Sequence, residues 1–476
     1  MASKQFNGKT KIALITLAVF FSLMLAAWLY QALEVGTTTL TKRAENSFIL
    51  ANVRLISMDN NAVQPNQAIV VRKGVIERIL PQGSEFPAGL AVIDGQQHYV
   101  MPGLIDMHVH VLDRSYAKSA LAYGVTTVRN MGGFPYHLKW QTELQQGLWY
   151  GARIITSSPI MNSLAQGDPL SHFSVDDPAI ARQAVRDFIG RGYNFIKVYE
   201  GLNADTYSAI LDEANALGVA VAGHPSYDLL QQAPEKHSAL QTFEHTEEIY
   251  DGFLQQQQNA DKALSAAEFL KNHSIALVPT LAVNRELTRL STEKLQYLQQ
   301  TDQAAINPFV RTIYENTSYK RWLNASAGLG EYNLATDQYF HQLTKLMATQ
   351  GVKIAVGSDA GALTGLPGPA TLDEIQLLAE AGLDNYSVLR AATVTAGELL
   401  GPTLKIGKLA TGYQADFILL ADNPLTTLTT LNTPKAVVQN GYYFNRADLN
   451  TLQQEAYQHS SWLLSISRHL SYLLFG

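Results

Sequence analysis

The chain has 476 residues, of which 46% are hydrophobic and 16% are charged, so it can form one large domain and a smaller one. Its formal net charge is −6 and no basic stripe is present, which argues against a nucleic-acid partner. It contains no cysteine, which excludes disulfides and thiolate metal sites. Any metal ion must therefore be held by nitrogen and oxygen atoms.

An apolar segment near the N-terminus, residues 12–33, carries no charge and is long enough to cross a bilayer. Basic residues precede it and aromatic residues lie near its far end: Lys4, Lys9, Lys11, Trp28 and Tyr30. The positive-inside rule then predicts that residues 1–45 form a cytoplasmic tail, a transmembrane anchor and a linker that is separate from the fold. The rest of the chain is expected on the extracytoplasmic side, periplasmic or extracellular. The alternative is a cleaved signal peptide followed by export.

Two segments, residues 46–100 and 404–447, contain short runs rich in β-branched residues and separated by turn residues. This pattern predicts the strands of an all-β unit. We expect the two segments to pair with each other, so that a small β-sandwich domain is built from both sides of the central region.

The central region, residues 101–403, alternates eight short apolar runs with helix-like stretches, which predicts an α/β fold, a (β/α)8 barrel of the TIM type. The eight runs cover residues 104–111, 125–131, 152–158, 195–199, 219–223, 242–245, 275–281 and 353–359. A helical insertion at about residues 283–349 separates the last two runs. It forms either a wall over the barrel mouth or a surface elaboration without a role.

The C-terminal segment, residues 448–476, predicts an amphipathic helix. Its apolar stripe consists of Trp462, Leu463, Ile466, Leu470, Leu473 and Leu474. Such a stripe either docks on its own protein or lies in a membrane interface.

The first apolar run of the barrel carries His108 and His110, one residue apart. Because side chains alternate along a strand, both imidazoles point the same way and suit one metal ion. Such a pair is weak evidence alone, but four later strand ends each carry a residue that can join it: Lys197, His224, His245 and Asp359. Functional side chains of these barrels sit at the C-terminal ends of the strands. The six residues are therefore expected to share a metal site.

The motifs around these residues resemble those of the amidohydrolase superfamily. They are PGLIDMHVH, FIKVY, VAGHP, FEHTEE, GSDAG and GYQADFILLADNPL. Within the superfamily the chain is similar to imidazolonepropionase-like and prolidase-like amidohydrolases, from about residue 46 to 450. The resemblance implies two divalent metal ions, with zinc as the expected metal.

The resemblance also assigns the ligands. His108, His110 and Asp359 would hold the first metal, and His224 and His245 the second. Lys197 would bridge the two ions after carboxylation by carbon dioxide, because an ammonium group has no lone pair to offer and a carbamate does. The alternative for Lys197 is a salt bridge to Glu200 or another neighbour.

The implied activity is hydrolysis of the C–N bond of a small amide by a hydroxide that bridges the two metals. Asp359 would act first as general base and then as general acid, or else only as a ligand. Expected substrates are dipeptides, including Xaa-Pro and Xaa-Arg/Lys types, or N-acyl amino acids. Alternatives are a cyclic-amide (imidazolone-type) hydrolase, a deaminase, and a membrane-tethered metal-binding protein without turnover.

Four further residues are weaker candidates. His172, Tyr199 and Tyr227 are expected to line the substrate pocket, although tyrosines at such positions commonly serve packing. Glu244, next to His245, is expected to orient a ligating imidazole. The resemblance is also compatible with a homo-oligomer.

Overall fold

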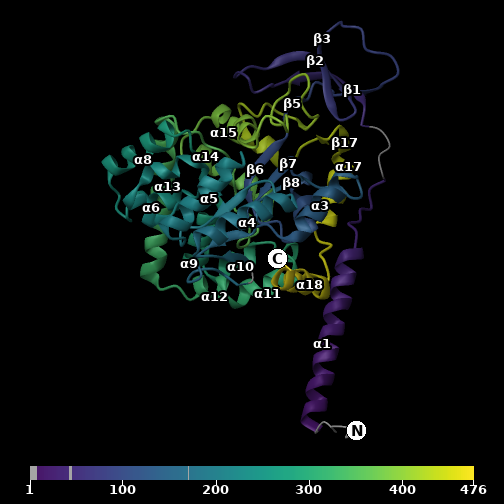
Figure 1. Ribbon diagram of the computed structural model, residues 1–476. Coiled ribbons are helices and arrows are strands. Elements are labelled where there is room, and N and C mark those ends of the chain that lie inside the picture. The colour runs from purple at the N-terminus through teal and green to yellow at the C-terminus, as the bar shows by residue number, and fades with distance from the viewer. Residues whose placement is uncertain (1–7, 42–45, 170, 476) are drawn as a thin grey trace.

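The structure is a computed structural model that describes residues 8–41, 46–169 and 171–475. Its centre is a barrel of short parallel strands, as Figure 1 shows, with helices around it and a mixed sheet at one end. The strands of the barrel are β6 (Leu104–Val109), β7 (Val125–Asn130), β8 (Arg153–Thr156), β11 (Ile196–Val198), β12 (Val221–Gly223), β13 (Leu240–Glu244), β14 (Ala276–Val278) and an eighth extended segment, 353–356. Two short strands, β9 (Ile160–Asn162) and β10 (His172–Ser174), extend the ladder beside β11.

The barrel closes through the eighth segment. Leu277 forms a parallel bridge to Ile354, and the Met107 amide donates to the Val356 carbonyl at 2.8 Å. The strands β6 and β7 are buried along their whole length, which explains why their sequences show no regular alternation of apolar and polar residues. The predicted (β/α)8 barrel is confirmed, with its strands within the expected runs except β13, which begins two residues before its run.

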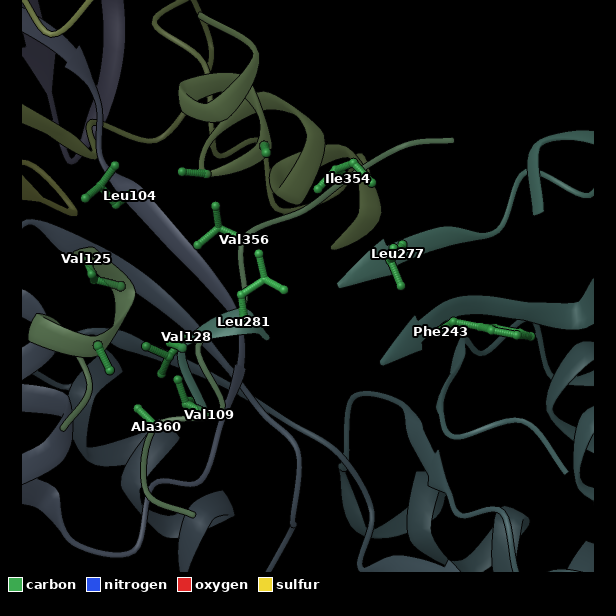
Figure 2. Packing of buried hydrophobic residues seen from close by; sticks show 14 of the residues in the cluster. Leu104, Val109, Val125, Val128, Phe243, Leu277, Leu281, Ile354, Val356 and Ala360 are labelled. Carbon is green, nitrogen blue, oxygen red and sulfur yellow. The ribbon is translucent and has the colours of Figure 1, made fainter. Parts of the chain in front are cut away.

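Buried apolar side chains fill the space between the strands and the helices around them. Figure 2 shows side chains from several strands in this core, among them Leu104, Val128, Leu277 and Val356. The surrounding helices are α2 (Arg114–Ala122), α3 (Pro135–Gln145), α4 (Pro178–Arg191), α5 (Ala204–Ala216), α6 (Tyr227–Gln232), α7 (Thr246–Glu248), α8 (Ala260–Asn272), α14 (Pro369–Glu380), α15 (Asn385–Ala391) and α16 (Val394–Leu399). Their ends follow local signals: Asp177 caps the amides of Ala179 and Ile180 at the start of α4, and Gly192 ends that helix in a left-handed conformation.

Segments from both sides of the barrel share the mixed sheet. Its strands are β1 (Phe48–Leu55), β2 (Gln64–Arg72), β3 (Val75–Pro81), β4 (Ala91–Asp94), β5 (Tyr99–Pro102), β15 (Phe417–Leu420), β16 (Ala436–Gln439) and β17 (Tyr442–Asn445). β15 pairs with β5 in the register Phe417 to Pro102, which joins the two segments directly. The eight strands form one hydrogen-bonded sheet, whereas a sandwich of two sheets was expected.

The single sheet follows from irregularities in β1. Its pairing with β2 shifts register on both sides of Val53, and Asn52 has a positive φ of 59°. Such bulges bend a strand and increase its twist. The first half of β1 pairs with β4 and its end pairs with β5 on the same edge. One bent sheet can therefore enclose the apolar core that was expected to lie between the two sheets of a sandwich.

The insertion is helical, as predicted. It contains α9 (Leu281–Thr292), α10 (Leu295–Gln300), α11 (Pro308–Asn316), α12 (Ser318–Leu323) and α13 (Ala327–Thr349). Figure 1 shows α9 to α12 at the end of the barrel opposite the strands β1 to β3. Glu286 in α9 accepts hydrogen bonds from the Thr364 and Gly365 amides at 2.9 and 3.1 Å, and Tyr319 in α12 donates to the Leu363 carbonyl. The insertion thus packs on the loop that follows Asp359, as a wall of the mouth would.

Helix α1 spans Gly8–Leu33, within which the anchor was predicted; Lys4 lies outside the described residues. Over the part of the chain that the structure describes, no helix combines the length and the apolar character that a membrane span requires. The predicted anchor therefore receives no support from the structure.

Residues 34–40 were expected to be a linker separate from the fold, and this expectation was wrong. Arg114 in α2 forms an ion pair with Glu34 at 2.5 Å, and Lys118 donates to the Thr37 carbonyl at 2.8 Å. Lys118 also pairs with Glu455 at the end of α17 (Arg446–Glu455). Partners more than 80 residues away thus hold the segment against the barrel.

The C-terminal helix α18 (Trp462–Phe475) packs on the protein with a different face from the predicted stripe. Leu464, Ser467 and Arg468 are buried, whereas Trp462 and Leu463 are 48% and 62% exposed. Arg468 lies 4.9 Å above the Trp140 ring, so a charged side chain occupies the docked face. The side chains after Arg468 lie outside the described residues.

Candidate metal centre

The six predicted ligands meet at the C-terminal ends of the barrel strands. His108 lies in β6 and Lys197 in β11, and three residues directly follow strands: His110, His224 and His245. Asp359 lies three residues beyond the eighth extended segment. Three potential ligand atoms, one each from His108, His245 and Asp359, lie within 4.8 Å of one another. His110 Nε2 lies 3.1 Å from Asp359 Oδ1, and His108 Nε2 lies 3.4 Å from the same oxygen.

Two of the imidazoles are prepared for metal binding by their second nitrogens. His108 Nδ1 lies 2.7 Å from Glu244 Oε2, and His245 Nδ1 lies 2.6 Å from Thr280 Oγ1. These contacts leave Nε2 of each ring for a metal. Burial lowers the pKa of both histidines well below its usual value, and nearby cationic groups lower it further. Neutral imidazoles are the form that binds metal ions.

Glu244, which was expected to orient a ligating imidazole, contacts the imidazole of His108 rather than that of its sequence neighbour His245. It is fully buried at the end of β13 and also accepts a hydrogen bond at 2.6 Å from Arg129. Consecutive side chains of a strand point to opposite sides, so Glu244 faces β6 and β7 inside the barrel. The sequence analysis missed Arg129, although a charged residue in the apolar run 125–131 was a usable signal.

His224 lies between two carboxylates that the sequence analysis did not assign to the site. Its Nδ1 is 2.8 Å from Glu200 Oε2 and 2.9 Å from Glu248 Oε1. Burial would lower the pKa of His224, but Glu248 and Glu200 outweigh burial and raise that pKa to about 9. The three residues form a second group with the spacing of a metal site, and the His224 and His245 rings are 4.8 Å apart.

Lys197 is fully buried, and its Nζ atom has no hydrogen-bond partner among the described residues. The expected alternative, a salt bridge to Glu200, does not form, because Glu200 contacts His224 instead. Burial lowers the pKa of Lys197 to about 8, against the opposing effect of Glu244 and Asp359. A buried amine without a hydrogen-bond partner, close to the group of His108, His245 and Asp359 and to the group around His224, fits a residue that is converted to an anionic metal ligand.

The three predicted pocket residues lie beside His224. Tyr199 stacks on the His224 ring at 4.0 Å between centroids, and His172 in β10 lies 5.1 Å from the Tyr199 ring. The third residue, Tyr227, starts α6 and lies close enough to Glu248 to raise its own pKa. Their contact with a substrate stays a prediction.

Comparison with known proteins identifies the class. The amidohydrolase family profile matches residues 99–442, and the chain belongs to this family. A segment of 89 residues is 38% identical to ochratoxinase of Aspergillus niger, and one of 91 residues is 29% identical to adenine deaminase of Chelativorans sp. strain BNC1. Each segment covers 18% of this chain, and 18% and 15% of the respective relative, so the chain matches less than a fifth of their lengths.

Two solved structures share the fold over most of the chain. Bottromycin amidohydrolase superposes with a TM-score of 0.72 at 22% identity and covers 91% of this chain and 93% of its own. A prolidase complexed with N-methylphosphonate-L-proline gives a TM-score of 0.66 at 22% identity, and the match covers 84% of this chain and 100% of the prolidase chain. Family and neighbours together support a hydrolytic enzyme that acts on C–N bonds of a small molecule. Divalent metals are typical of the family, and the donor set of this site fits them.

We predict that Lys197→Ala loses at least one metal ion per chain after loading with zinc and bicarbonate. The substitution removes the buried amine whose carboxylated form is proposed to bridge the two metal ions. Metal content measured by mass spectrometry on the folded protein tests this, with His172→Ala as a control that should keep its full content. An unchanged metal content in Lys197→Ala would exclude the bridging role.

Proposed function

We propose that this chain hydrolyses the amide bond of a small linear substrate, either a dipeptide or an N-acyl amino acid. The convergence of His108, His110, His224, His245 and Asp359 around the buried Lys197, whose Nζ atom has no hydrogen-bond partner among the described residues, is the observation that carries the proposal. The prolidase neighbour, which is complexed with N-methylphosphonate-L-proline, supports the peptide-like class.

The proposed ligand assignment is the one that the family resemblance implies, in which His245 is assigned to the second ion although its ring also lies within reach of His108 and Asp359. His108, His110 and Asp359 would hold one ion, His224 and His245 the other, and carboxylated Lys197 would lie between them. Two divalent ions held there would polarise the substrate carbonyl and supply hydroxide at neutral pH.

Carboxylation of Lys197 requires its neutral amine, which attacks carbon dioxide, forms the N–C bond and releases one proton. A pKa of about 8 in place of 10.5 raises the neutral fraction near pH 7 by roughly a hundredfold or more. Burial thus prepares the lysine for the modification. The same burial keeps water from the product carbamate.

Asp359 is proposed to move the proton. Its Oδ1 atom lies at the centre of the mouth, beside both His108 and His110. It would accept a proton from the attacking water and pass it to the nitrogen of the leaving amine. The backbone of Asp359 has a positive φ of 55°, which sets the carboxylate at the strand end.

A second candidate is deamination, which the match to adenine deaminase favours. Cyclic-amide hydrolysis and metal binding without turnover are further alternatives. Lys197 argues against deamination and cyclic-amide hydrolysis, because the single-metal members of the superfamily that catalyse these reactions tend to lack this lysine. The intact set of six candidate ligands argues against metal binding without turnover.

An extracytoplasmic location also stays a proposal, supported by the uncharged segment at residues 12–33 and the lysines before it. The segment would act as an anchor or as a cleaved export signal. Protease protection in cells stripped of any outer membrane tests the location, and the N-terminal sequence of the mature protein separates the two routes. A barrel that the protease reaches only after the cytoplasmic membrane is ruptured would contradict the extracytoplasmic location.

The proposed reaction predicts release of an amine from one class of linear amide. The assay uses the full-length protein, loaded with zinc and bicarbonate, on dipeptides, N-acyl amino acids, cyclic amides and adenine. Turnover of a linear class alone is the expected outcome. Turnover confined to adenine or to cyclic amides would replace the proposal by one of the alternatives.

We further predict that Asp359→Asn lowers kcat by about 10²–10⁴, the usual contribution of a general acid–base group. The amide retains an oxygen ligand but cannot accept the proton. Metal content is measured in parallel, so that loss of the ion is distinguished from loss of proton transfer. Near-normal turnover with full metal content would show that Asp359 is a ligand only.

A further inference from the structure

The loop that follows Asp359 is short, closed on itself and strained at its start. Asp359 has a positive φ of 55°, a conformation that a residue other than glycine keeps only where its surroundings hold it. Ala360 forms a parallel bridge with Val109, and Figure 2 shows the two residues next to each other. The Gly361 amide donates to the Gly365 carbonyl at 2.9 Å, which closes the turn between them. The loop therefore begins as a continuation of the barrel and folds back at once.

Two glycines show how closely the loop is enclosed. A Cβ atom on Gly361 would lie 2.2 Å from the His110 carbonyl oxygen, and one on Gly365 would lie 2.6 Å from Oε1 of Glu286. A side chain at the first position would collide with backbone, and one at the second would displace the Glu286 carboxylate. The loop is thus held between the end of β6, where His110 lies, and helix α9, which carries Glu286.

Side chains of the insertion bind the far side of the loop. Oε2 of Glu286 accepts hydrogen bonds from the Thr364 and Gly365 amides at 2.9 and 3.1 Å. Tyr319 in α12 donates to the neighbouring Leu363 carbonyl at 3.1 Å. Three consecutive residues of the loop are therefore bound by the insertion, and Glu286 binds two of them.

A third side chain of the insertion lies near both Glu286 and Asp359. Tyr314 in α11 donates to the Gly361 carbonyl. Burial raises the pKa of Tyr314, and the Asp359 and Glu286 carboxylates raise it further, because each is close enough to act on the phenol. The insertion thus contacts the loop at its beginning as well as on its far side.

The carboxylate of Glu286 costs stability at neutral pH. It forms no salt bridge with a described residue, and Arg289, one turn further along α9, pairs with Glu293. Burial raises the pKa of Glu286 to about 7, although its hydrogen bonds with the loop lower it. Its contribution to stability therefore falls as the pH rises from 4.5, its usual pKa, to about 7. Groups kept at such a cost are typical of functional sites.

We propose that Glu286, assisted by Tyr319, is a positioning residue for Asp359. By holding the far side of the loop, it keeps the Asp359 backbone in its left-handed conformation and the carboxylate beside His108 and His110. The inference rests on the proposed function, in which Asp359 is both a metal ligand and the proton carrier. Glu286 acts only through the loop.

Two variants of similar size separate the hydrogen bonds of Glu286 from its packing. Glu286→Met fills the same space but accepts no hydrogen bond from the loop amides, whereas Glu286→Gln keeps an oxygen that accepts them. Glu293→Met, a substitution in the same helix at a carboxylate that pairs with Arg289, is the control. We expect Glu286→Gln to melt no lower than the native protein at pH 8, because it removes the charge and keeps the acceptor.

A spectroscopic test requires no substrate. The full-length protein is loaded with cobalt(II), whose visible absorption depends on the geometry of its ligands. We expect Glu286→Met to change the cobalt spectrum and to speed amide hydrogen exchange in residues 360–365 by about tenfold or more. Glu286→Gln and Glu293→Met should keep the native spectrum and the native exchange rates. A native spectrum in Glu286→Met, or an equal change in Glu286→Gln, would overturn the proposal.

The kinetic test uses the amide that the native protein hydrolyses fastest. In Glu286→Met we expect kcat to fall by about tenfold or more with little change in KM, because the loss affects proton transfer and not substrate binding. Glu286→Gln should restore most of kcat. If Glu286→Met does not fold, Tyr319→Phe removes one hydrogen bond to the loop and should change the same readouts in the same direction. Unchanged readouts in that variant would also contradict the proposal.

The two tests keep this inference separate from the hydrolase proposal. A cobalt spectrum that changes in Glu286→Met but not in Glu286→Gln, with no amide hydrolysed by the native protein, would support the positioning role and refute the hydrolase activity. Hydrolysis by the native protein, with the same kcat in Glu286→Met, would support the activity and refute the positioning role.

Discussion

The buried carboxylate of Glu244 holds the metal centre together. It accepts a hydrogen bond from Arg129 at 2.6 Å and contacts His108 Nδ1 at 2.7 Å, and all three side chains are at most 1% exposed. Loss of either charge would leave the other buried and unpaired, at a cost of about 3–5 kcal/mol. Arg129 also donates to the Met107 carbonyl, so the interaction ties β7 and β13 to the strand that carries the first ligands. The orientation of His108, and through it the place of Asp359, depends on this interaction.

The backbone at the mouth is strained in three places. His245, Thr280 and Asp359 have φ values of 67°, 53° and 55°, which cost about 1–3 kcal/mol each for residues other than glycine. Hydrogen bonds from the barrel hold them: the His245 amide donates to Val278, and the Asp359 amide donates to His108. The closed barrel therefore supplies the rigidity that these turns require. The candidate ligands lie at the C-terminal ends of its strands, so the barrel also determines the direction in which their side chains point.

Much of the fold and the meeting of the six candidate ligands at one end of the barrel could be predicted because their signals are local. Short apolar runs mark the strands, and a histidine, lysine or aspartate at the end of a run is placed at the mouth by the barrel itself. Features that depend on distant partners could not be predicted in this way. The bulge at Asn52, the docking of Glu34 on Arg114 and the burial of Arg468 each involve partners that no local pattern shows. The carboxylates around His224 were missed for the same reason, since Glu200 and Glu248 come from different strand ends.

The insertion supports the loop that follows the candidate metal centre. Glu286 in α9 accepts hydrogen bonds from the Thr364 and Gly365 amides, and Tyr319 in α12 donates to the Leu363 carbonyl. These bonds fix the chain a few residues beyond Asp359, the proposed proton carrier. Of the two roles that the sequence left open for the insertion, the contacts therefore favour a wall of the barrel mouth, and the choice could not be made from the sequence because it depends on partners in another segment.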